Sequence, residues 1–172
     1  RHEPRREVRV LAGEYRVEPS LPHGAFGAMG GLVTTAPDLA RYVAFHLSAY
    51  PPRDGPDAGP VRRSSVREMQ RMQRFSGGVS QARANGYGYG LRVTADCRFD
   101  HIVAHGGGLP GFGSYMMWLP DYGVGLFAMA NLTYSAPTAG LEEALNALRR
   151  TGALQPRIWT PSPALTKTQQ DL

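Results

Sequence analysis

The stretch AHGGGLPGFGSYMMWLP, residues 104–120, places a histidine directly before three consecutive glycines. His105 offers an imidazole, and Gly106, Gly107 and Gly108 leave the backbone bare. Backbone N–H groups beside a polar side chain can stabilise an oxyanion, and a strand without side chains lets a substrate lie against it. The stretch therefore predicts a strand edge that binds a substrate or takes part in catalysis. A kinked structural strand with an incidental histidine is the alternative that these residues alone leave open.

The same glycines also match a phosphate-binding loop, because Gly106, Gly108 and Gly111 satisfy the pattern G-x-G-x-x-G. That mechanism needs the N-terminus of a helix directly after the glycines. Pro110 and the segment FGSYMMW follow instead, and this composition favours a strand. We therefore expect no nucleotide and no other cofactor.

A metal site is a third reading, because Cys97, His101 and His105 recur every four residues. On a helix this spacing would place the three side chains on one face, but HIVAH before three glycines is not helical. In a strand, a step of four residues spans about 13 Å, which one ion cannot bridge. We therefore expect no bound metal.

The elements that position this stretch read as a mixture of strands and helices. Aromatic and β-branched residues predict four strands, at 87–95, 101–107, 112–120 and 122–132. The segment LPDYG (119–123) predicts a hairpin turn between the last two strands. Residues 7–18 read as extended.

Helices are expected on both sides of these strands in the sequence. Thr35 can cap a helix over 36–47, which carries Pro37 in its first turn and an apolar face. A short helix over 66–73 can be capped by Ser64 or Ser65. Residues 137–150 form an amphipathic helix with one apolar face, made of Leu141, Ala144, Leu145 and Leu148. The fold class is therefore α+β, an antiparallel sheet flanked by helices.

Composition narrows the choice of partners. The 172 residues suffice for one domain, and the net charge of +5 comes from arginines that are not interleaved with aromatic residues. We therefore expect no nucleic-acid partner, and no apolar run is long enough for a membrane span. Cys97 is the only cysteine, so no internal disulfide can form.

Several motifs in order carry a resemblance to a known family. HGGGLPGFGSYMMWLPDYGVGLFAMANL, with AMGGLVTTAPDLARYVAF and GYGYGLRV before it, resembles the C-terminal region of the serine β-lactamase and penicillin-binding-protein superfamily. The resemblance covers residues 24–150. It is to the class C β-lactamases in particular, with their esterase and D-aminopeptidase relatives.

The resemblance implies roles for named residues. His105, Gly106 and Gly107 stand where the family has Lys-Thr-Gly at its edge strand, and Gly108 would supply one oxyanion N–H group. Asn131 would hold a substrate carboxylate or, equally, cap the end of its strand. A histidine in place of lysine carries no permanent charge, which favours the esterase-like branch.

The nucleophile motifs of that family are absent from this sequence. No serine has a lysine three residues later, and neither Tyr-x-Asn nor Ser-x-Asn occurs. We therefore expect residues 1–154 to be the C-terminal half of a β-lactamase/transpeptidase-like domain, incomplete without an N-terminal half, and 155–172 to be a Pro-rich linker. The complete protein, with both halves of this domain, would cleave a small ester, a peptide or a β-lactam through an acyl-serine. The resemblance also favours a periplasmic or secreted location. The alternative is a non-catalytic relative that binds peptide or cell-wall fragments.

Overall fold

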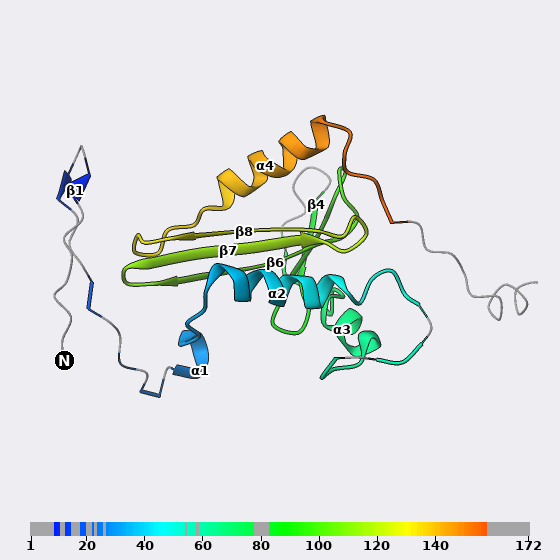
Figure 1. Ribbon diagram of the computed structural model, residues 1–172, viewed down its shortest axis with the longest axis horizontal. Coiled ribbons are helices and arrows are strands. Elements are labelled where there is room, and N and C mark those ends of the chain that lie inside the picture. Colours follow the sequence, from blue (N-terminus) through cyan, green and yellow to red (C-terminus); the bar gives the residue numbers. More distant parts are fainter. Residues whose placement is uncertain are drawn as a thin grey trace, which may run out of the picture.

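The computed structural model describes residues 9–10, 13–14, 18–19, 22, 24–25, 27–53, 55–57, 59–77 and 83–157. Its centre is a six-stranded antiparallel sheet in the order β3-β4-β5-β6-β7-β8, which is the order of the strands in the sequence. Helix α4 lies on one face of the sheet and helix α2 on the other (Figure 1). The expected α+β architecture, a sheet flanked by helices, is therefore confirmed.

The strands that follow His101 form a meander. Its strands are β6 (Ile102–Leu109), β7 (Phe112–Leu119) and β8 (Val124–Ala130). In its register His105 lies opposite Met116, which lies opposite Phe127. The turn between β7 and β8 contains Gly123 at φ +66°, a backbone conformation that glycine adopts without strain. The strands and the turn predicted for this region are confirmed.

Helix α4 (Thr138–Arg150) closes one face of the meander. Leu141 and Leu145 are buried in a cluster of side chains from β6, β7 and the turn before β6, namely Phe99, Ile102, Ala104, Met117 and Leu119. The predicted apolar face is thus half right, because Ala144 and Leu148 are exposed. They lie on the side of α4 that turns away from the sheet.

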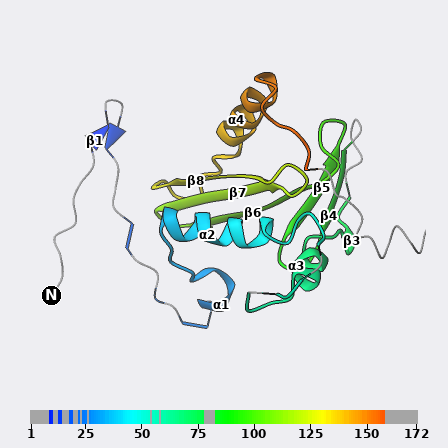
Figure 2. The same ribbon diagram turned by 45° about the vertical axis from the view of Figure 1, so that its right-hand side comes forward.

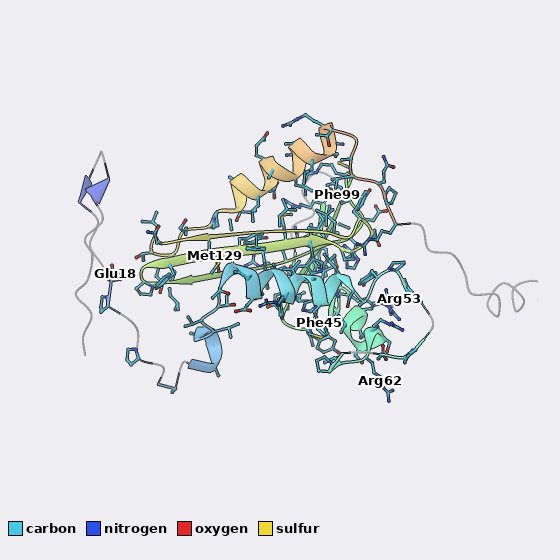
Figure 3. All side chains as sticks on the ribbon, in the orientation of Figure 1. Glu18, Phe45, Arg53, Arg62, Phe99 and Met129 are labelled. Atoms are coloured by element: carbon cyan, nitrogen blue, oxygen red, sulfur yellow. The ribbon has the colours of Figure 1, made fainter. Side chains whose placement is uncertain are left out.

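Helix α2 (Ala36–Leu47) covers the opposite face. Thr35 caps it as predicted, since its hydroxyl accepts a hydrogen bond from the backbone N–H of Asp38. Val43 packs with Leu91, Val103 and Trp118, and the helix comes so close to β8 that a Cβ on Gly125 would lie 2.3 Å from the side chain of Val43. Figure 3 shows Phe45 of α2 and Phe99 on opposite sides of the sheet.

Two sequence predictions need correction. The strand expected over 87–95 is instead a hairpin, made of β4 (Arg83–Tyr87) and β5 (Arg92–Asp96). A turn at 88–91 separates them, in which the Gly88 N–H donates to the Leu91 carbonyl and Gly90 has φ +71°. The sequence does not show this turn clearly, because tyrosines, which favour strands, alternate there with glycines, which favour turns. The two-residue strand β3 (Arg74–Phe75) pairs with β4 at the edge of the sheet.

The short helix also begins earlier than predicted. Helix α3 spans Arg63–Met69, so Ser64 and Ser65 lie inside it and cap nothing. The carboxylate of Asp57, six residues back in a loop, accepts the Arg63 N–H at 3.0 Å. A loop side chain has therefore replaced the local cap. A single-turn helix, α1 (Gly27–Gly30), precedes α2.

The two ends of the chain are described only in part. Within the extended segment expected at 7–18, β1 (Arg9–Val10) pairs with β2 (Gly13–Glu14), and most other residues of that segment lie outside the described residues. Of the predicted linker at 155–172, only 155–157 are described. The backbone N–H of Arg157 donates a hydrogen bond to the Asp121 carbonyl, in the turn between β7 and β8, at 2.5 Å.

Candidate functional site

The second half of β6 has no strand partner on the side where β5 ends, and the short helix α1 contacts β6. Strand β5 pairs with β6 only over Ile102–Ala104, whereas β7 pairs with β6 from Val103 to Leu109. Within the described part of the chain, residues 105–109 therefore have a strand on one side only (Figure 2). Successive residues of a strand direct their backbone N–H and C=O groups to alternate sides. Some of these groups thus face the open edge, where an extended ligand can pair with them.

His105 is the first residue of β6 beyond its pairing with β5. Its imidazole Nε2 lies 3.2 Å from the hydroxyl of Tyr87, and the two rings meet edge to face with centroids 6.5 Å apart. His105 is half-buried, and Tyr87 keeps 39% of its surface exposed. The pair thus places a phenol and an imidazole, both able to donate and accept hydrogen bonds, at the start of the open edge.

Each of the three glycines after His105 also has a packing reason. A Cβ on Gly106 would lie 3.1 Å from the ring of Tyr115, and one on Gly108 would lie 2.9 Å from the ring of Tyr134. A Cβ on Gly107 would lie 2.7 Å from the hydroxyl of Ser114. Side chains at these three positions would crowd Tyr115, Ser114 and Tyr134, so close packing by itself favours glycine here. The structural and the functional reasons for glycine coexist in the same residues.

Tyr115, which lies opposite Gly106, packs against the buried cluster on the α4 face of the sheet, whereas His105 shares the other face with Met116. Burial raises the pKa of the Tyr115 phenol, and the positive charge of Arg92 acts in the opposite direction. Because the net shift is upward, this phenol stays protonated at neutral pH. Its hydroxyl belongs to the α4 face of the sheet and is no neighbour of the His105 imidazole.

Asn131 is not brought to His105. It is exposed and follows the last residue of β8, Ala130, which lies opposite Gly113, which in turn lies opposite Gly108. Two strand spacings of about 4.8 Å each separate β8 from the open edge. Figure 3 labels Met129, two residues before Asn131, on β8.

The other residues with metal-ligand chemistry have separate surroundings. His101 precedes β6, and its Nε2 lies 2.8 Å from the Gln70 carbonyl oxygen, while its ring meets Tyr50 edge to face. Cys97 is exposed in the turn after β5. Among the residues that the structure describes, no three histidine, cysteine or acidic side chains form a group that could hold a metal ion.

Sequence reasoning missed Tyr87 as a member of the site. In the sequence, the segment GYGYG indicates part of a strand and a motif of the family, and neither assigns Tyr87 to the site. Two tyrosines, each followed by a glycine, end β4 and form the turn before β5, and only the first of them meets His105. The sequence does carry one signal for Tyr87, since an aromatic residue directly before a glycine-rich turn lies at the end of its strand.

An antiparallel sheet with a helix on each face and a bare, histidine-bearing strand edge fits the serine β-lactamase and penicillin-binding-protein class. The model of the Beta-lactamase family matches residues 1–150 of this chain, and the chain belongs to that family. The curated proteins contain no significant match. Helices of the described part do not reach the length and apolar character needed to cross a bilayer.

One solved structure shares the fold. It is the octameric penicillin-binding protein homologue from Pyrococcus abyssi, with a TM-score of 0.57 and 21% sequence identity. The similarity covers 67% of this chain and 24% of that chain. This chain therefore corresponds to about a quarter of the length of the protein that it resembles.

Proposed function

We propose that this chain supplies the substrate-docking edge of a serine hydrolase of the class C β-lactamase-like kind. The parent cleaves an ester or amide bond of a small ester, a peptide or a β-lactam through an acyl-serine. The observation that carries the proposal is the open edge of β6 from His105 to Leu109, which begins with an imidazole and continues through three residues without side chains.

Each residue of the edge has a proposed role. His105 provides a hydrogen-bond or acid–base group next to the scissile bond, and the N–H of Gly108 donates to the developing oxyanion. Gly106 and Gly107 let the substrate backbone approach the strand. Asn131, which follows the end of β8, keeps two proposed roles, holding a substrate carboxylate or capping the end of its strand.

The nucleophile is proposed to come from outside these 172 residues. Covalent catalysis requires a nucleophile with an adjacent base, and Ser-x-x-Lys is absent from the sequence. The partner of this chain is therefore an N-terminal half of the same domain, which would carry Ser-x-x-Lys and Tyr-x-Asn, together with a small-molecule or peptide substrate.

The test compares this chain with the complete protein encoded by its reading frame. Both are incubated with a fluorophosphonate probe, a fluorescent penicillin, p-nitrophenyl butyrate and nitrocefin. The complete protein should be labelled stoichiometrically on one serine, and the 172-residue chain should be neither labelled nor active. Labelling of a serine within this chain would contradict the proposed division of the site.

A non-catalytic relative that binds peptide or cell-wall fragments is the second candidate, and the absence of Ser-x-x-Lys favours it. The same experiment separates the two. A complete protein that retains cell-wall peptides on a column, takes up no probe and hydrolyses neither substrate would support the binding protein and contradict the hydrolase.

A further inference from the structure

The contact between Tyr87 and His105 joins two strands that do not pair with each other. Strand β5 lies between β4 and β6, and the register aligns Tyr87 with Arg92 and Arg92 with Ala104. His105 is the next residue of β6, just beyond the point where β5 pairing ends. The hydroxyl of Tyr87 and Nε2 of His105, 3.2 Å apart, therefore meet past the end of the intervening strand.

This contact uses one ring nitrogen of His105 and leaves the other available. Nδ1 has no hydrogen-bond partner among the described residues. In a neutral imidazole one nitrogen carries the proton and the other accepts, and the hydrogen bond that one of them makes decides which tautomer is present. A phenol oxygen is a weak acceptor because its lone pair is delocalised into the ring, whereas the unprotonated imidazole nitrogen is a good acceptor. The hydroxyl of Tyr87 is thus the donor to Nε2.

We propose that Tyr87 is a positioning residue that holds neutral His105 as its Nδ1–H tautomer, so that Nδ1–H is the donor presented to a substrate at the open edge. This inference rests on the proposed hydrolase function. It also bears on the substrate class, because a neutral imidazole forms no ion pair with a carboxylate, which the permanent charge of a lysine at this position would form. An uncharged acyl group, the carbonyl of an ester or amide, is the acceptor that suits the neutral donor.

The tautomer can be measured directly in the 172-residue chain. The protein is labelled with ¹⁵N at histidine, and long-range ¹H–¹⁵N spectra are recorded at pH 8.5, about two units above the ordinary pKa of a histidine. His105→Gln assigns the signals. In the unsubstituted protein His105 should carry its proton on Nδ1, and in Tyr87→Phe the population should move toward the Nε2–H form that the histidine side chain prefers in water.

Tyr89→Phe is the matched control. Tyr89 lies two residues after Tyr87, is 59% exposed and, among the described residues, shares no hydrogen bond or ring contact with His105. Its substitution should leave the tautomer unchanged. A protein whose His105 is protonated on Nε2 would overturn the inference, and so would a Tyr87→Phe variant in which the tautomer does not change.

Kinetics of the complete protein supply a second readout. Tyr87→Phe should lower kcat/KM for a neutral ester by about 2- to 10-fold, the size expected for one neutral hydrogen bond. Tyr89→Phe should not lower it. A complete protein without any hydrolase activity would contradict the proposed function and leave the tautomer result intact. An active protein in which Tyr87→Phe has unchanged kcat/KM would overturn the positioning role alone.

Discussion

The indole N–H of Trp118 donates to the side-chain oxygen of Gln70 at 2.7 Å, and both residues are completely buried. The side-chain amide nitrogen of Gln70 in turn donates to the backbone carbonyls of Val66 and His46. The backbone carbonyl oxygen of Gln70 lies 2.8 Å from Nε2 of His101. One glutamine thus connects β7, α2, α3 and the start of β6. This network holds the α2 face of the sheet at the base of the strand that carries His105.

Gln70→Leu should destabilise the protein by about 2–4 kcal/mol. The substitution leaves the buried indole N–H of Trp118 without an acceptor, and an unsatisfied buried donor costs about 1–3 kcal/mol in addition to the bonds lost elsewhere. Urea unfolding followed by tryptophan fluorescence measures the change. Gln73→Leu is the control, because Gln73 is exposed and should change the free energy of unfolding by less than about 1 kcal/mol. Equal effects of the two substitutions would show that the network contributes nothing specific.

Leu145→Ala should cost about 2–5 kcal/mol of unfolding free energy, because the side chain is 2% exposed at the centre of the α4 face and its removal leaves a cavity. Leu148, one turn further along α4, is 37% exposed, so Leu148→Ala should cost clearly less. Thermal unfolding of the two variants gives the comparison. A smaller loss for Leu145→Ala than for Leu148→Ala would mean that α4 does not pack on the sheet as described.

His46 should make the protein less stable in mild acid. The imidazole is 1% exposed, stacks on Trp118 and has no hydrogen-bond partner on either ring nitrogen among the described residues, and burial lowers its pKa to about 4. The unfolded chain takes up this proton near pH 6.5, whereas the folded protein takes it up only near pH 4. The free energy of unfolding is therefore unaffected by protonation of this histidine above pH 6.5. It decreases as the pH falls below 6.5, by about 2 kcal/mol at pH 5.

The variant His46→Phe isolates this contribution, since phenylalanine can keep the stacking on Trp118 and does not titrate. Free energies of unfolding are measured for both proteins between pH 7 and pH 5, above the range in which most carboxylates titrate. The difference between the two proteins should shift in favour of the variant as the pH falls. A difference that is constant over this range would contradict the assignment to His46.

Substitutions of His105 and His101 should have opposite signatures in the complete protein. His105 lies at an open edge, so His105→Ala should lower kcat/KM by roughly 10- to 1000-fold with little change in the melting temperature. His101 packs against Tyr50 and contacts the buried Gln70, so His101→Ala should lower the melting temperature and leave kcat/KM nearly unchanged. Full activity together with reduced stability in His105→Ala would make that histidine a structural residue.

Periodicity in the sequence predicts the elements whose residues form a local pattern. Aromatic and β-branched residues in 112–120 and 122–132 predict β7 and β8, and the apolar face and Thr35 cap of 36–47 predict α2. Periodicity fails where the decisive partner lies outside the element or the composition is uniform. Asp57, in the loop six residues before Arg63, accepts the first N–H group of α3, and the aromatic run 87–95 conceals a reversal of the chain.

By itself the sequence determined that an imidazole is followed by three bare residues in a strand, that this strand belongs to a meander, and that the motif order resembles one family. These properties depend only on residues that are adjacent or close to one another in the sequence. Only the tertiary structure decided that β5 stops pairing at Ala104, that Tyr87 meets His105, and that Asn131 lies two strands away. Strand registers and strand ends are set by packing on both faces of a sheet, and that packing joins residues far apart in the sequence.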